Sequence, residues 1–304
     1  MESPSTRPRQ NKALGIGLRV GATTCFAFMA AMIKLGYEAG VSTPELVFYR
    51  FAFGLPPLIA WIAWSGAWGA WRTARPLAHG WRALAGLTTM VLAFSALAYL
   101  PLAESTTIGF AAPLFAVILS ALVLKEQVGR HRWSAVIVGL VGVVLVTRPE
   151  GSGLPAVGLL LAVLAALGVG VTTITIRQIG RTESTQTTVL WFSLLSVLAV
   201  GGLMPVYAEF HDARTWAILA ALGGFGGVAQ LMLTASLRYA PVSVVTPFDY
   251  TQLLWAVLLG WTIFGNAPPS STWAGAAIII LSGLYTLYRE HKLGREKPRV
   301  APPL

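Results

Sequence analysis

The chain has 304 residues, of which 55% are apolar and 11% charged, and its formal net charge is +10. Soluble domains carry about 25% charged residues, so this composition excludes an ordinary water-facing surface and indicates that lipid is the main solvent. The basic residues lie in short loops without forming a basic stripe, which argues against a nucleic-acid partner, and the single cysteine, Cys25, excludes an internal disulfide.

Apolar segments follow one another along the chain, most of them close to the 20 or so residues that a helix needs to span a bilayer. Alternating strand patterns are absent, so the predicted fold class is an all-α membrane protein with ten transmembrane helices rather than a β-barrel. The predicted helices cover residues 14–36, 43–64, 83–101, 103–124, 132–147, 155–177, 187–207, 215–237, 242–264 and 271–289. We expect cytoplasmic tails at residues 1–12, which we expect to be disordered, and at residues 293–304.

Lysine and arginine gather in every second loop of this arrangement. The basic residues of the other loops are only Arg148 and Arg214, and these loops hold the acidic residues Glu38, Glu104, Glu150, Glu209 and Asp212. The basic set comprises the N-terminal tail, the loops after the second, fourth, sixth and eighth helices, and the C-terminal tail. Because short basic loops stay in the cytoplasm, we expect a multi-pass protein of the cell inner membrane with both termini cytoplasmic. A helix count wrong by one would scramble this alternation, which favours ten.

The chain also resembles itself at an offset of 140 residues. The matching positions are Tyr99 with Tyr239, Pro101 with Pro241, Thr106 with Thr246 and Trp133 with Trp273. We therefore predict two repeats of five helices, residues 13–148 and 153–292. An odd number of spans forces the second repeat to insert upside down, and inverted repeats are typical of alternating-access transporters with a midplane site. The alternative is a duplication that only builds a stable bundle.

The segment from Tyr99 to Val146 resembles the hallmark segment of EamA-type members of the drug/metabolite transporter superfamily. Glu126, the pair Gly139 and Gly142, and the stretch Phe48-Tyr49-Arg50-Phe51 belong to that pattern, whereas Asn266 replaces the acid in the second half. The resemblance implies a central cavity walled by helices one to four and six to nine, with helices five and ten peripheral. Among such families, the bacterial aromatic amino acid exporters are most similar in general appearance.

Charges inside predicted helices are expensive, about 2.5–3.5 kcal/mol at mid-helix on insertion scales. Asp249 lies between Phe248 and Tyr250 and close to Pro247, which interrupts the helical hydrogen bonds. This setting suits a site for a solute that bears an amine and a ring, and the alternatives are a structural partner for a nearby cation or a capping role.

Two basic residues also fall inside predicted helices. Arg50 could clamp a carboxylate, but the resemblance places a basic residue here whatever the substrate. We therefore expect a structural ion pair with Glu45 or Asp249, or a side chain that extends outward. Lys34 is expected to extend to the interface.

The predicted solute site is a midplane cavity between the repeats, with aromatic walls and a few polar groups. Its residues are Tyr99, Phe110, Gln230, Phe248 and Tyr250, with Thr89, Thr172 and Asp249 as polar additions. The alternative is that these aromatics fill the bundle core. Gln230 follows the glycine run of residues 223–227, which permits close helix approach or bending.

Several kinds of chemistry are missing from the sequence. The four histidines, His79, His131, His211 and His291, are placed in loops or the tail, no Walker loop is present, and no catalytic residue, metal or cofactor is predicted. We expect a transporter, exporter or facilitator, of small organic metabolites such as amino acids, aromatic ones included, working as a monomer or weak homodimer in the lipid bilayer. The alternatives are a membrane-embedded transferase, a transporter of another metabolite class, and a channel or scaffold.

Overall fold

The computed structural model describes residues 11–123, 125, 128–147, 153–180 and 182–296, and the regular structure in these ranges is helical. Within these ranges, eight helices are long and apolar enough to cross a membrane. They are α1 (Lys12–Glu38), α2 with α3 (Thr43–Ala52 and Leu55–Trp64), α4 (Pro76–Tyr99), α5 with α6 (Leu102–Gly109 and Ala112–Leu122), α7 (Arg130–Thr147), α8 (Ala156–Ile179), α11 (Ala213–Tyr239) and α14 (Ser270–Glu296). Glu126 and the expected tails at residues 1–10 and 297–304 lie outside the described residues.

The two remaining predicted spans are shorter or divided. The helix α9 (Thr185–Gly201) has 17 residues and is followed by α10 (Met204–Tyr207). The predicted helix at residues 242–264 consists of α12 (Val242–Val245), the 3-10 helix η2 (Thr246–Tyr250) and α13 (Thr251–Phe264). A second 3-10 helix, η1 (Trp68–Trp71), precedes α4. The count of ten spans therefore stays a prediction.

Some boundaries differ from the predicted ones. The helix α4 begins at Pro76 rather than at residue 83, because a proline suits the first turn of a helix, where no internal N–H bond is needed. His79, expected in a loop, consequently lies within α4. The last helix continues to Glu296, so residues 293–296 are helical instead of forming part of a tail.

Prolines divide two of the spanning segments at places that the sequence pattern alone did not mark. A proline lacks the backbone N–H and its ring clashes with the carbonyl four residues earlier. That carbonyl belongs to Ala52 for Pro56 and to Gly109 for Pro113, and these are the last residues of α2 and α5. Each span therefore has a joint near its middle, at Phe53–Gly54 and at Phe110–Ala111.

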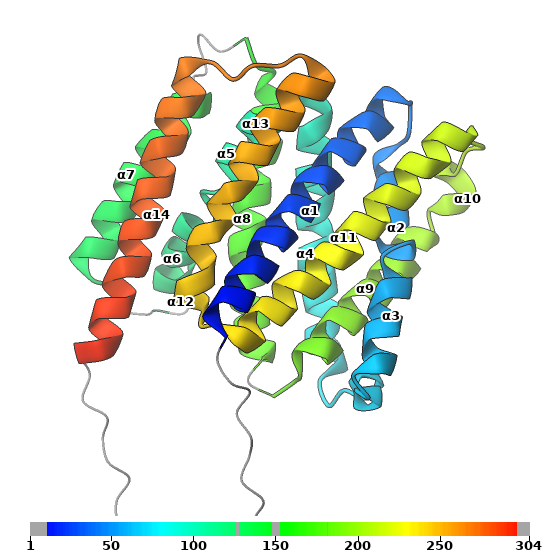
Figure 1. Ribbon diagram of the computed structural model, residues 1–304, viewed down its shortest axis with the longest axis horizontal. Helices are drawn as coiled ribbons and strands as arrows, with labels where there is room; N and C mark the ends of the chain where they lie inside the picture. Colours follow the sequence, from blue (N-terminus) through cyan, green and yellow to red (C-terminus); the bar gives the residue numbers. More distant parts are fainter. Residues whose placement is uncertain (1–10, 124, 126–127, 148–152, 181, 297–304) are drawn as a thin grey trace, which may run out of the picture.

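The helices pack in antiparallel pairs that join the first predicted repeat to the second. The start of α1 lies against the end of α11, where a Cβ at Gly15 would meet Ala240. In the same way α4 packs on α8, and α7 packs on α14 at one side of the bundle (Figure 1). Figure 1 also shows that α1 begins and α14 ends at the same end of the bundle, here called the near end.

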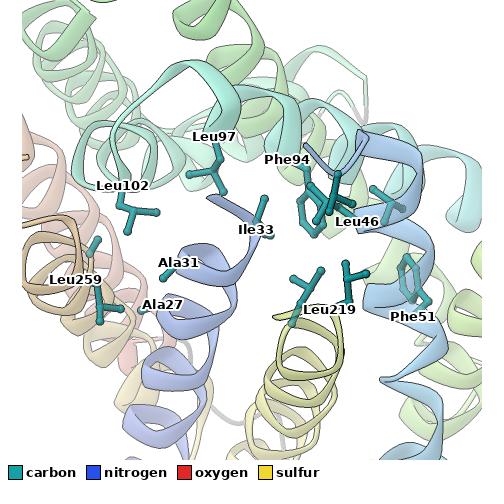
Figure 2. Close-up of a cluster of buried hydrophobic side chains, with 14 of the residues drawn as sticks. Ala27, Ala31, Ile33, Leu46, Phe51, Phe94, Leu97, Leu102, Leu219 and Leu259 are labelled. Atoms are coloured by element: carbon teal, nitrogen blue, oxygen red, sulfur yellow. The ribbon is translucent and has the colours of Figure 1, made fainter. Parts of the chain in front are cut away.

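The opposite end of the bundle, the far end, is filled by a cluster of buried apolar side chains from both predicted repeats. Figure 2 shows Ile33 of α1, Leu46 of α2 and Phe94 of α4 converging, with Leu219 of α11 close by. Each of these four residues is at most 3% exposed. Apolar packing therefore joins the two predicted repeats at the far end.

Candidate functional site

Arg50 of α2 lies where the first predicted repeat meets α9 and α11 of the second, and it is only 6% exposed. Its side chain lies against the glycine run of α11, because a Cβ at Gly226 would stand 2.6 Å from Arg50 Cδ and 2.7 Å from its Cζ. Arg50 lines a cavity of about 20 Å³ together with Gln230 and Ser193. The glycine therefore creates the space that the guanidinium occupies.

No carboxylate among the described residues forms an ion pair with Arg50, and its Nε has no hydrogen-bond acceptor. The ring of Phe51 compensates part of the charge, and its centroid lies 5.2 Å from the guanidinium carbon. The prediction of a structural ion pair with Glu45 or Asp249 is therefore wrong, and burial excludes the outward-reaching side chain as well.

Glu45 is engaged at the far end of the bundle. Its carboxylate is 1% exposed and accepts a hydrogen bond from the backbone N–H of Glu209 over 3.0 Å. His211 Nε2 lies 2.9 Å from the same oxygen, and Ser42 of the α2 capping box donates to the other. This cluster ties the start of α2 to the segment before α11.

Asp249 is engaged by Arg19 of α1 in a two-point ion pair. Nη2 of Arg19 donates to Oδ2 of Asp249 over 2.5 Å, and its Nε donates to Oδ1. The side chains are 12% and 28% exposed. Nearby, the hydroxyl groups of Thr23 and Thr251 are 2.9 Å apart. Sequence reasoning missed Arg19, although a charge inside the predicted helix at residues 14–36 was a signal of the same kind as Asp249.

Phe110 and Tyr250, which hold equivalent places in the predicted repeat, are in direct contact. Their ring centroids are 5.0 Å apart and the rings are almost perpendicular, at 79°. The Tyr250 hydroxyl reaches α14, where a Cβ at Gly283 would overlap it. Tyr250 also lines a cavity of about 330 Å³ between α6, α8 and α14.

The other predicted site residues do not join a single cavity in this conformation. Thr89 and Thr172 donate to carbonyls of their own helices, those of Ala85 and Val169. Tyr99 is 50% exposed at the end of α4, and Phe248 is half-buried in η2. Only Gln230 lies beside Arg50.

A second, partly buried cation lies near the Arg50 cavity. The guanidinium of Arg82 stands over the ring of Phe192 at 4.2 Å, and its Nε and Nη1 have no hydrogen-bond partner. Phe192 also lines the Arg50 cavity, and its ring meets that of Phe51 at 5.1 Å and 90°. Beside them, His79 is fully buried and neither of its ring nitrogens has a hydrogen-bond partner.

The Lys34 side chain reaches the end of α4, and its expected extension to the membrane interface stays a prediction. Its ammonium donates to the carbonyl of Leu100 over 3.1 Å and approaches that of Leu97 at 3.5 Å, and it stands over the Phe264 ring. The last carbonyls of a helix have no partner within the helix, so Lys34 caps the end of α4.

At the near end, Glu183 ties the segment after α8 to the segment before α4. Its Oε1 accepts hydrogen bonds from the Thr73 hydroxyl over 2.8 Å and from the Ala74 backbone N–H over 3.0 Å. The Thr73 hydroxyl holds the pKa of the Glu183 carboxyl below its usual range, and the Ala74 amide adds to this. Polar contacts between the predicted repeats therefore exist at both ends of the bundle.

Comparison with known proteins gives a family model that matches the chain twice. The model is described as the EamA-like transporter family, and it matches residues 13–148 and again residues 156–288.

Individual relatives cover most of the chain at low identity. The chain is 28% identical over 266 residues to a riboflavin transporter of Vibrio cholerae, covering 87% of this chain and 89% of the relative. It is 26% identical over 248 residues to an S-adenosylmethionine uptake transporter of Rickettsia prowazekii, with coverages of 82% and 84%. A solved crystal structure matches with a TM-score of 0.64 and 22% identity, over 90% of this chain and 97% of that one, which supports the fold alone.

Proposed function

The chain belongs to the EamA-like transporter family and is a multi-pass membrane transporter, and we propose that it moves small amphipathic organic solutes, amino acids among them, by alternating access between two inverted repeats. The observation that carries this proposal is the Arg50 cavity. Polar groups from the first repeat, Arg50, and from the second, Gln230 and Ser193, line this cavity together; Arg50 and Ser193 are buried and Gln230 is half-buried.

The pattern of helix contacts supports inverted repeats as the internal architecture. In the two predicted repeats α1 corresponds to α8, α4 to α11 and α7 to α14. Exchange of the repeats therefore turns the pair α1–α11 into the pair α8–α4, and it leaves the pair α7–α14 unchanged. The two helices of each of these pairs run antiparallel to each other. The helical breaks at Phe110–Ala111 and at Tyr250–Thr251 also stand at equivalent positions, and the family model matches each half separately.

Ties across the interface at each end support alternating access. At the near end Arg19 pairs with Asp249 and Glu183 accepts from Thr73, so both contacts join one repeat to the other. At the far end the apolar cluster and the contacts of Glu45 do the same. Opening the cavity toward either side requires one set of ties to separate while the other holds.

Aromatic rings next to the buried polar groups support an amphipathic solute. Phe51 and Phe192 line the Arg50 cavity, and Phe28 of α1 stacks on Phe225 of α11 with centroids 5.4 Å apart. A ring can stack on such walls while an amine or carboxylate finds a fixed partner, which suits aromatic amino acids. The named relatives carry other ring-bearing solutes, riboflavin and S-adenosylmethionine, which are the competing candidates.

The proposed solute path has Gln230 at its centre and Phe110, Phe248, Asp249 and Tyr250 along one flank. Tyr99, Thr89 and Thr172 lie on or beside the contact between α4 and α8, so they join the path only when these helices part. We further propose that the near end faces the cytoplasm, because α1 begins and α14 ends there and the basic loops of the sequence are assigned to the same side.

A reconstitution experiment tests this function. The purified chain in proteoliposomes is expected to take up at least one of four tracers, L-phenylalanine, L-tryptophan, riboflavin or S-adenosylmethionine, with saturable kinetics. Liposomes that hold Gly223→Leu protein, whose added side chain would clash with Tyr49 and Phe53 at the interface, serve as the control. Uptake no faster than in this control for all four tracers would contradict the proposal.

A further inference from the structure

Arg50 carries a buried positive charge for which the described residues supply no counter-ion. A guanidinium taken out of water is costly unless a counter-ion and hydrogen bonds replace its hydration. Among the described residues, no carboxylate forms an ion pair with Arg50, its Nε lacks an acceptor, and the residue is 6% exposed. The contact with Phe51 compensates only part of such a cost.

The groups that line the cavity supply no charge that would reduce this cost. The second cation, Arg82, lies over Phe192, the ring that also lines the Arg50 cavity. The polar side chains that line the cavity with Arg50 are Gln230 and Ser193, and both are neutral. The region between α2, α9 and α11 is therefore electropositive and holds no anion of its own within the described chain.

The glycines around Arg50 indicate that this arrangement is built into the fold. Gly226 leaves room for the guanidinium, and a Cβ at Gly54 would stand 3.1 Å from Arg50 Nη1. The joint between α2 and α3 at Phe53–Gly54 follows directly after Arg50. A cavity of about 20 Å³ holds about one water molecule, so a larger anion enters only when the two repeats separate around this joint.

We propose that Arg50 is the anion subsite of the transport path, and that a carboxylate of the solute becomes its counter-ion while the solute is bound. The proposal rests on the transport function proposed above and narrows its substrate class to carboxylate-bearing solutes. A guanidinium pairs with a carboxylate through two parallel hydrogen bonds, which fits one buried arginine facing a small polar cavity. An inorganic anion such as chloride has the same charge and is the competing source.

A stability cycle on the solute-free protein tests the missing counter-ion. Arg50→Gln is expected to raise the melting temperature of the purified chain, because it removes an uncompensated buried charge. In the wild-type background, Gln230→Glu is also expected to raise the melting temperature, because the new carboxylate lines the same cavity as Arg50. In the Arg50→Gln background, the same substitution is expected to lower the melting temperature. Gln252→Glu on α13 is the matched control and is expected to lower it equally in both backgrounds.

The proposal is overturned if Gln230→Glu shifts the melting temperature equally with and without Arg50, or if Arg50→Gln lowers it as loss of a structural ion pair would. Should Arg50→Gln fail to fold, the comparison of Gln230→Glu with Gln252→Glu in the wild-type background decides the same question. A rise for the first and a fall for the second supports the subsite, and equal falls overturn it.

An uptake assay in proteoliposomes identifies the source of the anion. With L-phenylalanine as tracer, phenylacetate is expected to compete and phenethylamine is not, and Arg50→Lys is expected to slow uptake about tenfold or more. Replacement of chloride by isethionate is expected to leave uptake unchanged, and dependence on chloride would overturn the carboxylate assignment. If L-phenylalanine is not carried, that result counts against the amino-acid proposal alone. The stability cycle needs no tracer, so it still decides the role of Arg50.

Discussion

Phe110 and Tyr250 stand 140 positions apart in the sequence, and their rings meet edge to face with centroids 5.0 Å apart. Residues that are equivalent in two repeats touch each other only near the axis that relates the repeats. The contact between α7 and α14 shows the same pattern. At the offset of 140 residues, Gly139 corresponds to Ile279 and Gly142 to Ser282, yet Gly139 lies against Ser282 and Gly142 lies against Ile279. Exchanged contacts of this kind are expected near such an axis, and they support the proposed twofold relation between the halves.

The first prediction concerns the orientation of the loops. A reporter enzyme fused after residue 180 is expected to be active in the cytoplasm, and one fused after residue 210 is expected to be active outside it. The basis is the distribution of lysine and arginine among the loops. The same location for both reporters would exclude the ten-helix topology and the inverted repeat together.

The second prediction concerns the ion pair between Arg19 and Asp249. Loss of either partner leaves a charge in a mostly buried place, so Arg19→Gln and Asp249→Asn should each lower stability by about 1–3 kcal/mol. The exchanged pair, Arg19→Asp with Asp249→Arg, should recover part of that loss, as measured by thermal unfolding of the purified protein. No recovery in the exchanged pair would show that the contact does not hold α1 to η2.

The third prediction uses two neighbouring glycines of α11. A Cβ at Gly223 would stand 2.6 Å from the Tyr49 carbonyl oxygen, whereas a Cβ at Gly224 would meet nothing within 4 Å. Gly223→Ala should therefore destabilise the protein by about 1–3 kcal/mol. Gly224→Ala should be neutral or stabilise it by up to about 1 kcal/mol through helix propensity. Equal effects in thermal unfolding would mean that α2 and α11 pack less closely than described.

The fourth prediction separates solute contact from packing. Gln230 lines the Arg50 cavity, so Gln230→Ala should slow tracer uptake about tenfold while leaving the melting temperature unchanged. Gln252→Ala, on α13, is the control and should change neither quantity. If uptake by Gln230→Ala equals that of the wild type, Gln230 is a packing residue and the centre of the proposed path lies elsewhere.

The sequence was a good guide to the spanning segments, because a run of apolar residues and the need to bury it in lipid are local properties. The predicted helix at residues 215–237 corresponds to α11 (Ala213–Tyr239), and the glycine run within it does pack closely on α2. The division of one helix at Pro113 was also readable in principle, since the proline and its effect on Gly109 are local.

The partners of the charged residues could not be read in the same way. Whether Asp249 meets Arg19 or Arg50 depends on how α1, α2 and η2 pack, and these elements are far apart in the sequence. The lack of a partner for Arg50 is harder still to foresee, because Glu45 lies on the same helix but faces His211. Long-range packing, rather than residue type, decides which charged side chains pair with each other.

Downhill uptake without an imposed gradient tests the central claim most directly. Among the described residues, Asp249 is held by Arg19 and no further carboxylate faces the Arg50 cavity, so we expect transport to need no proton gradient. Purified protein in liposomes of equal internal and external pH should accumulate one of the four tracers, to the external concentration and no further. Uptake that occurs only with a pH gradient and is abolished by Asp249→Asn would contradict the account, because Asp249 would then be a proton-coupling group.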